Sequence, residues 1–324
     1  MSKETAILDI LENRAGKLAK RRQFFRSAGG LGLGLVGGTI LGACGGGSGS
    51  PAVAQTGPSD ADILNFALNL EYLEASFYAY ATTGAGLPAS MMGGVGTPGM
   101  VIPGQQVDFS GDPLVGAYAA EIARDELEHV NFLRTALGAS AVAMPALDLG
   151  ATSYANAFSA AAYAAGVIGA GQVFNPYSSP TNFLIGAFIF EDVGVTAYKG
   201  AAPLITNKTY LSAAAGILAA EAYHAGLVRT VLYAKGIATP SLGLIAAANA
   251  ISAARASLDN VGNDDQGISG ATAGSSNIVP LDSNGLAFSR NYPNVLNIVY
   301  LNSAAVTQGG FFPAGVNGDL HMSA

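Results

Sequence analysis

The chain has 324 residues, of which 50% are hydrophobic and 11% are charged, so it is long and apolar enough to bury a large core. Its single Cys excludes a disulfide within the chain. The formal net charge is −7, and residues 44–324 carry eight Lys and Arg against nineteen Asp and Glu. An acidic body of this kind argues against nucleic acid as a partner.

Residues 1–43 have the features of an export signal and are not expected to belong to the fold. Seven of the fifteen basic residues fall in this stretch, and the run Lys-Arg-Arg-Gln-Phe-Phe-Arg at 20–26 resembles the twin-arginine consensus. Seventeen uncharged residues follow, and they are too few and too rich in glycine for a stable transmembrane helix. The segment predicts recognition by export machinery and a periplasmic location.

The only cysteine, Cys44, follows a Leu-Gly-Ala sequence and so lies where the lipobox of bacterial lipoproteins is lipidated. Lipidation there would anchor the protein to a membrane, through more than one acyl chain because a single chain binds weakly. The alternative is an ordinary signal cut after Ala54, which ends a small-x-small sequence. Residues 44–59, rich in Gly, Ser, Pro and Ala, are expected to form a flexible tether.

Two helices are expected in the first half of a bundle that covers residues 60–236. The first should run over about 61–82, behind Ser59 or Asp60 as N-cap. The second should begin at Asp112-Pro113, with Pro in the first turn, and end near Leu137. The segment between them holds eight Gly and three Pro, so we expect a long loop.

A crossover over residues 139–180, with a short Ala-rich helix inside it, should lead to the second half of the bundle. The third helix is expected to begin at Thr181 as its cap, and the fourth to end near Lys235 with Gly236 just beyond its last turn. Residues 237–324 are expected to be a C-terminal appendix of further helices and loops. Its Phe311 and Phe312 should pack on the bundle, and its His321 should lie in a solvated tail.

A Glu-x-x-His pattern occurs twice, at Glu126 and His129 and again at Glu221 and His224. Residues three apart on an α-helix lie on one face, one turn apart. Two such pairs on facing helices can therefore direct two carboxylates and two imidazoles to one point. The chain has three His, and two of them lie in this pattern. The pattern predicts half of a di-iron or di-manganese site.

The other half of such a site is one Glu from each of two further helices. Glu71 and Glu191 each lie in a strongly apolar helical run. An ionised carboxylate in an apolar core is costly unless it is paired or bound to a metal. Each of these Glu is also followed seven residues later by a Tyr, Tyr78 and Tyr198, about two helical turns on and so on the same face.

At these residues the sequence resembles the ferritin-like superfamily of ferritin, bacterioferritin, rubrerythrin and manganese catalase. The run from Leu64 to Glu74 is most similar to bacterial ferritin-like proteins related to plant desiccation-related proteins. The resemblance covers residues 60–233 and implies an all-α, ferritin-like four-helix bundle with a long crossover, plus extra C-terminal helices and loops. It also implies two Fe or Mn ions held by six side chains: Glu71, Glu126, His129, Glu191, Glu221 and His224.

Further residues are expected to support these ligands, because a metal-bound His usually donates its free ring N–H to a carboxylate. The Asp-Glu-x-x-His run is similar to that of bacterioferritin-like sites, which implies that Asp125 accepts from His224. The alternative is that Asp125 is a surface charge. Asp192 is the nearest candidate acceptor for His129. Tyr78, Tyr198 and Glu74 are expected beside the ligands. In the family that the sequence resembles, the first-helix ligand precedes a Tyr by seven residues, which implies Glu71 and not Glu74 as the ligand.

Three functions are compatible with these features. The first is a di-metal oxidoreductase, ferroxidase or catalase-like, that acts on O₂, peroxide or Fe(II) in stress protection, with a small oxidant or metal ion as its partner. The second is a non-enzymatic desiccation or stress protein in which the Glu and His groups form a vestigial site satisfied by hydrogen bonds. The third, an iron-storage cage, is disfavoured by the tether, the long loop and the appendix. The sequence is also compatible with a homo-oligomer.

Overall fold

The computed structural model describes residues 57–262 and 264–324. The export signal over residues 1–43, the lipidation of Cys44 and the alternative cut after Ala54 all lie outside the described residues, as does most of the tether. Those predictions therefore have no structural counterpart.

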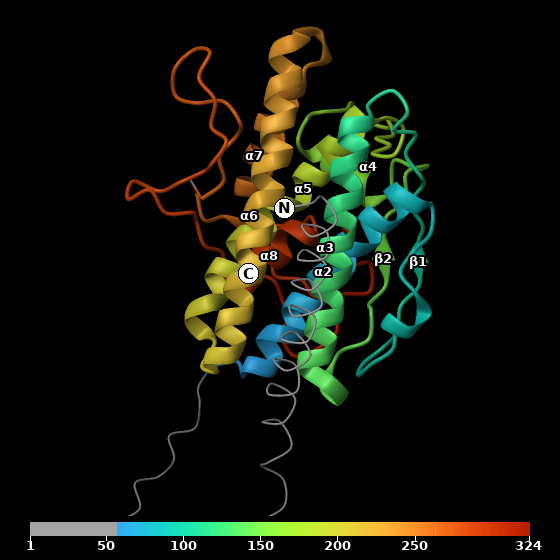
Figure 1. The fold of residues 1–324 in the computed structure, drawn as a ribbon, viewed down its shortest axis with the longest axis vertical. Helices are drawn as coiled ribbons and strands as arrows, with labels where there is room; N and C mark the ends of the chain where they lie inside the picture. The colour runs from blue at the N-terminus through green and yellow to red at the C-terminus, as the bar shows by residue number, and fades with distance from the viewer. Residues whose placement is uncertain (1–56, 263) are drawn as a thin grey trace, which may run out of the picture.

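Four long helices form a bundle, which confirms the all-α prediction (Figure 1). They are α2 (Asp60–Thr83), α3 (Pro113–Leu137), α5 (Pro180–Ala201) and α6 (Lys208–Ala238). The two most extensive helix contacts in the described chain are α2 along α3 and α5 along α6. The long segment between α3 and α5 is the crossover expected of a ferritin-like bundle.

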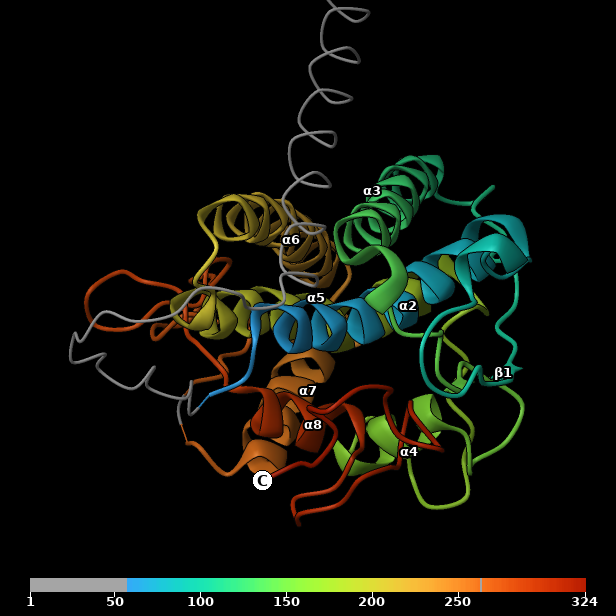
Figure 2. The same cartoon turned by 90° about the horizontal axis from the view of Figure 1, so that it is seen from below.

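The bundle is covered on one side, so its helices have unequal environments. Figure 2 shows α2 and α5 between α3 and α6 on one side and α4, α7 and α8 on the other. This sandwiching explains why α2 and α5 are apolar nearly all round, whereas α3 and α6 keep one solvated face. The carboxylates in the middle of these two helices, on Glu71, Glu74, Glu191 and Asp192, are therefore all buried although they point in different directions.

The starts of the first two helices follow their predicted caps. Ser59 and Asp62 form a capping box on α2, and the Asp112 side chain accepts from the backbone N–H of Val115 on α3, with Pro113 in the first turn. These contacts satisfy backbone donors that have no partner inside the helix.

Two predicted helix boundaries are wrong, the start of α5 and the end of α6. Helix α5 is capped by Ser179, whose side chain accepts from the N–H of Asn182, and not by Thr181. Helix α6 continues through Gly236 to Ala238. A Cβ on Gly236 would lie 2.6 Å from the side chain of Ile245, so this glycine serves a close approach between helices and not a cap.

The connections pack on one side of the bundle. Strands β1 (Val101–Ile102) and β2 (Leu147–Asp148) pair in parallel and join the long loop after α2 to the crossover, which also holds α4 (Ala157–Ala164). The predicted loop is thus partly fixed by backbone pairing. Short 3₁₀ turns complete the connections: η1 (Ala89–Met91), η2 (Gly138–Ser140), η3 (Ala202–Leu204) and η4 (Pro240–Leu242).

The C-terminal segment adds α7 (Leu244–Asp259) and α8 (Tyr292–Val299), which pack on α5 and, for α7, on α6. The ring of Phe311 lies 4.8 Å from that of Phe190 on α5, centroid to centroid, which confirms that this aromatic packs on the bundle. His321 is exposed, as expected of a tail residue. The appendix therefore covers the back of α5.

Candidate metal centre

The structure brings the six predicted ligands together in the middle of the bundle. Each is buried, and the most exposed, His129, has 9% of its surface accessible. Helix α2 supplies one carboxylate, α5 supplies one, and α3 and α6 each supply a Glu and a His. The side chains are Glu71, Glu126, His129, Glu191, Glu221 and His224.

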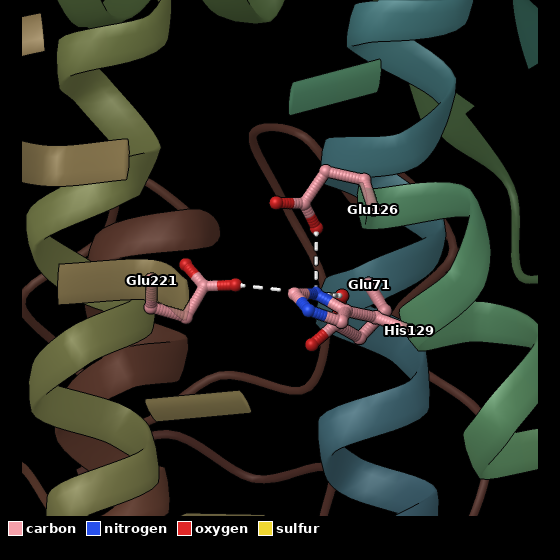
Figure 3. A group of neighbouring side chains, drawn as sticks. All are labelled: Glu71, Glu126, His129 and Glu221. Carbon is pink, nitrogen blue, oxygen red and sulfur yellow. Dashed lines mark hydrogen bonds and ion pairs between the residues drawn. The ribbon is translucent and has the colours of Figure 1, made fainter. Parts of the chain in front are cut away.

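The first group of ligands surrounds His129 (Figure 3). Its Nδ1 lies 3.2 Å from Oε2 of Glu71, 3.4 Å from Oε2 of Glu126 and 3.5 Å from Oε1 of Glu221. One ligand atom from each of these four residues lies within 4.8 Å of the others. Three carboxylates and one imidazole thus converge on a volume the size of one ion.

The second group surrounds His224. Its Nδ1 lies 3.0 Å from Oε1 of Glu126 and 3.7 Å from Oε2 of Glu191. Ligand atoms of Glu191, Glu221 and His224 lie within 4.8 Å of one another. Glu221 belongs to both groups and Glu126 contacts both imidazoles, so each of these two carboxylates is shared between the two groups.

The cluster has more acceptors than donors, and this is the test of whether it fits metal ions. Five buried carboxylate oxygens, on Glu126, Glu191 and Glu221, and Nδ1 of His224 make no well-directed hydrogen bond among the described residues, although four of these oxygens lie 3.0–3.7 Å from an imidazole nitrogen. Buried polar atoms without hydrogen bonds are costly, and ionised carboxylates have no donor to offer one another. Two divalent cations would satisfy all of them, and carboxylate with imidazole is a donor set suited to Fe and Mn. The residues fit the metal pair.

Burial and close packing shift the pKa values of the ligand side chains strongly. Burial raises the pKa of Glu71 to about 7 and that of Glu191 to about 8, and it raises the pKa of Glu221 well above its usual range. Burial alone would lower the pKa of each imidazole, but the facing carboxylates raise the pKa of His129 to about 11 and that of His224 to about 9. Without cations, protons therefore take their place in balancing the charge.

The two tyrosines bind across the bundle. The hydroxyl of Tyr78 on α2 donates to Oε1 of Glu191 on α5, and the hydroxyl of Tyr198 on α5 donates to Oε1 of Glu71 on α2. In both carboxylates Oε2 is then the oxygen that faces an imidazole. Each tyrosine thus fixes the orientation of a ligand on the opposite helix.

Asp125 lies against the imidazole predicted for it. Its Oδ2 is 3.3 Å from Nε2 of His224, and its side chain is 47% exposed. The neighbouring Arg124 donates to the backbone carbonyl of Ala120. Asp125 therefore contacts the ring nitrogen of His224 that faces away from the ligand group, where it can hold the tautomer that leaves Nδ1 free.

The pairing expected between Asp192 and His129 is wrong. Oδ2 of Asp192 accepts from Nη1 of Arg229 and from Nη2 of Arg255, each at 2.7 Å. Asp192 is one residue from Glu191 and therefore lies about 100° round α5, which turns it toward α7 and away from α3. The partners were missed because arginines distant in sequence give no local signal of a shared contact.

Gly194 is a further residue that the sequence analysis missed. It lies one turn after Glu191, and a Cβ there would be 2.4 Å from Oε2 of Glu221 and 3.5 Å from Oε1 of Glu74. Glu74 is itself buried, and its pKa is raised well above the usual range by burial first and by the neighbouring carboxylates. A glycine within the apolar run of α5 was the only available signal, and its role is to leave room for the carboxylate of Glu221.

Comparisons with known proteins agree with this geometry. The chain is 30% identical over 279 residues to the desiccation-related protein PCC13-62 of Craterostigma plantagineum, covering 80% of this chain and 83% of that protein. It is 27% identical over 277 residues to the ferritin-like catalase Nec2 of Nesocodon mauritianus, covering 81% and 85%. No solved structure gives a significant match. The family model of the ferritin-like domain matches residues 59–234, and the chain belongs to this family.

Proposed function

We propose that this protein holds two Fe or Mn ions between its four ligand helices and uses them to break down peroxide. The observation that carries the proposal is the set of buried ligand atoms without hydrogen bonds, which converge in two groups and form the donor set that suits Fe and Mn. The similarity to a protein named ferritin-like catalase supports peroxide as the substrate. Two molecules of hydrogen peroxide would yield two of water and one of O₂.

The metal pair, when bound, would supply reversible redox chemistry that passes two electrons from one peroxide molecule to another. The chain's own residues hold the site in shape. Tyr78 and Tyr198 fix the carboxylates of Glu191 and Glu71, and Asp125 orients the imidazole of His224. Burial excludes bulk water, which strengthens every electrostatic interaction inside the site.

The test begins with metal analysis of the purified full chain, followed by assays of O₂ release from hydrogen peroxide. We expect two Fe or Mn ions per chain and O₂ release that depends on them. His129→Gln should abolish both. His321→Gln, the same substitution in the exposed tail, should change neither. A fully metal-loaded protein that releases no O₂ from peroxide would contradict the proposal, and oxidation of Fe(II) by the same sample would identify a ferroxidase instead.

A non-enzymatic role in desiccation or stress is the second candidate. It is favoured by the similarity to a protein named desiccation-related, which extends over most of both chains. In that case the cluster would be vestigial. Purified protein without metal, and without turnover after addition of Fe(II) or Mn(II), would support this candidate over the first.

We also propose that the protein is exported and held at a membrane by lipid on Cys44, on the strength of the sequence signals in residues 1–43. Arg21→Lys combined with Arg22→Lys should retain the protein in the cytoplasm. Cys44→Ser should move it from the membrane fraction to the soluble periplasmic fraction. Membrane retention of the Cys44→Ser variant would favour a different anchor, and release of the unaltered protein would favour the cut after Ala54.

A further inference from the structure

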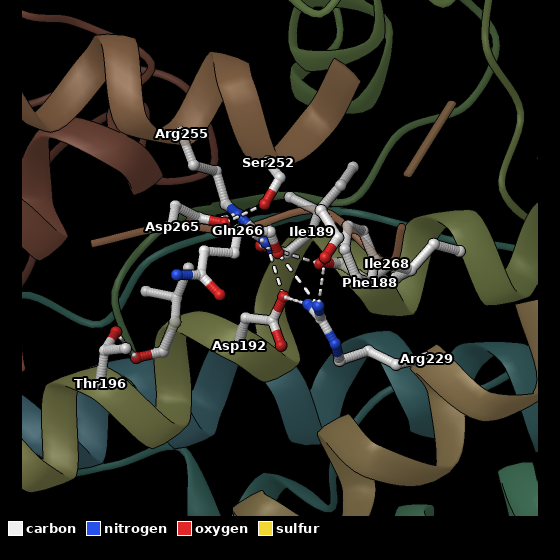
Figure 4. Close-up of polar contacts among 12 residues, drawn as sticks. Phe188, Ile189, Asp192, Thr196, Arg229, Ser252, Arg255, Asp265, Gln266 and Ile268 are labelled. Atoms are coloured by element: carbon white, nitrogen blue, oxygen red, sulfur yellow. Dashed lines mark hydrogen bonds and ion pairs between the residues drawn. The ribbon is translucent and has the colours of Figure 1, made fainter. Parts of the chain in front are cut away.

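A second cluster of buried charges lies behind α5, on the side away from the ligands. It contains the guanidinium groups of Arg229, Arg255 and Arg290, each with at most 2% of the residue exposed. Buried guanidinium groups are costly unless they are paired. Figure 4 shows two of them converging on Asp192. We call this set of side chains the arginine cluster.

The arginine cluster holds one short stretch of α5. Arg255, on α7, donates to the backbone carbonyls of Phe188 and Ile189 and, through Nη2, to Asp192. Its guanidinium carbon also lies 4.7 Å from the centre of the Phe188 ring. Arg229, on α6, donates to the same Oδ2 of Asp192 at 2.7 Å. Three helices therefore meet at a single carboxylate oxygen.

The stretch held from behind is the one that carries a ligand in front. Glu191 directly precedes Asp192, and its carboxylate faces His224 and the hydroxyl of Tyr78. Arg229 lies five residues after His224 on α6. A rotation of α5 about its axis moves Asp192 and Glu191 together, because the helix backbone is stiff. The contacts of Asp192 therefore help to set the direction of the Glu191 side chain.

We propose that Asp192 is a positioning residue for the metal centre. Bound by Arg229 and Arg255, it fixes the rotation of α5 against α6 and so places Glu191 at the ligand group of His224. The C-terminal appendix, through Arg255, is then part of the metal site's support. The proposal rests on the proposed function, since it concerns the ligands of the same metal pair.

The competing explanation is an ordinary buried ion pair that supports only the fold. Asp259, on α7, offers a matched control, because it is also buried and pairs with an arginine of the same cluster. Its Oδ2 is 2.6 Å from Nε of Arg290. Across residues 57–262 and 264–324, the Asp259 carboxylate has polar contacts with Arg290 and the backbone of Val261 but with no residue of α5, although Arg290 itself donates to Thr196 on that helix.

The experiment is a calorimetric titration of the full, metal-free chain with Mn(II), with far-UV circular dichroism to confirm folding. The unaltered chain should bind two ions tightly. Asp192→Asn leaves two adjacent guanidinium groups without their shared charge. It should lower the affinity for one of the two Mn(II) ions by roughly 10–100-fold, which is the usual effect of losing a residue that supports a ligand. Asp259→Asn should bind both ions as tightly as the unaltered chain.

Arg255→Lys serves as a second variant in case Asp192→Asn does not fold. A lysine keeps the charge, but one ammonium group cannot reach the carboxylate and the backbone carbonyls together. It should lower the affinity for the same ion. The positioning role would be overturned if both Asp192→Asn and Arg255→Lys bound two ions as tightly as the unaltered chain. It would also be overturned if Asp259→Asn lost as much affinity as they did. Either outcome would leave the proposed function standing. Failure of the unaltered chain to bind Mn(II) or Fe(II) would overturn both.

Discussion

The metal centre and the arginine cluster are two buried assemblies of charge on opposite sides of α5, and they differ in how the charge is balanced. In the arginine cluster, each of the four carboxylates that face it accepts from at least one guanidinium group, and among the described residues its fully buried oxygen without a hydrogen bond is Oδ2 of Asp264. In the metal centre, five carboxylate oxygens lack a well-directed hydrogen bond. The charges of the first assembly are nearly balanced within the chain, and the second needs protons or cations to balance it.

The comparison shows that buried charge by itself does not mark a ligand site. Both assemblies would be unusual in a chain with only 11% charged residues. The distinguishing observation is the balance of donors and acceptors, because an excess of acceptors can be relieved only by protons or metal ions. The following predictions test this difference.

The largest effect is expected when an arginine is removed. Arg290 pairs with Asp259, Asp264 and Asp265, and its loss would leave these carboxylates without that cationic partner. Arg290→Met should lower the free energy of unfolding by about 3–5 kcal/mol, as for other buried pairs broken on one side. Chemical denaturation of the metal-free chain measures this loss. A change below about 1 kcal/mol, the range of surface pairs, would mean that the arginine cluster is not self-balanced.

The opposite response is expected in the metal centre. Burial disfavours the ionised form of Glu221 in the metal-free chain, and Glu221→Gln replaces it with a neutral amide of similar shape, so the metal-free variant should be at least as stable as the unaltered chain. Because Glu221 belongs to both ligand groups, the variant should lose the stabilisation by Mn(II), which amounts to about 3–4 kcal/mol at 100–1,000 times the dissociation constant. Thermal unfolding with and without Mn(II) tests both halves, and destabilisation of the metal-free variant would contradict the comparison.

The stability of the metal-free chain and its affinity for metal should depend on pH in opposite directions. In the metal-free chain the pKa of Glu71 is raised by burial from its ordinary 4.5 to about 7 and that of Glu191 to about 8, so the folded state binds more protons than the unfolded state across this range. Stability therefore falls as pH rises from 5 to 8.

Metal must displace the same protons, so Mn(II) affinity should rise with pH through this window, by up to about tenfold per pH unit for each proton displaced. The lowered pKa of Glu126 acts only below its ordinary value of 4.5 and does not oppose the trend. Titrations with Mn(II) at pH 6, 7 and 8 give the slope. An affinity independent of pH would show that the carboxylates are already ionised in the metal-free chain.

The smallest effect is expected from the tyrosines. Tyr78→Phe and Tyr198→Phe each remove one hydrogen bond to a buried ligand carboxylate and leave the ring in place. Each should weaken metal binding by about 1.5–3 kcal/mol, the net value of a hydrogen bond to a charged group. Because the tyrosines bind across the bundle, Tyr78→Phe should affect the ion near His224 and Tyr198→Phe the ion near His129. The reverse assignment would contradict the crossed pairing.

Much of the ligand set was predictable because it depends on local geometry. The i, i+3 spacing places Glu126 with His129, and Glu221 with His224, on one helix face in any α-helix. Isolated charges in apolar runs predicted burial for Glu71 and Glu191. The capped starts of α2 and α3 followed for the same reason, whereas the cap of α5 was wrongly placed at Thr181. The end of α6 was also wrong, because Gly236 is needed for close packing against α7 and does not end the helix.

The sequence by itself determined an all-α chain, four helices with inward-facing carboxylates, and two Glu-x-x-His pairs, because helical periodicity and the cost of buried charge act over a few residues. Only the tertiary structure decided that each tyrosine binds the carboxylate of the opposite helix. It also decided that Asp192 turns to Arg229 and Arg255, and that Gly194 makes room for Glu221. These contacts depend on the rotation and separation of whole helices, which are set by packing between segments distant in sequence.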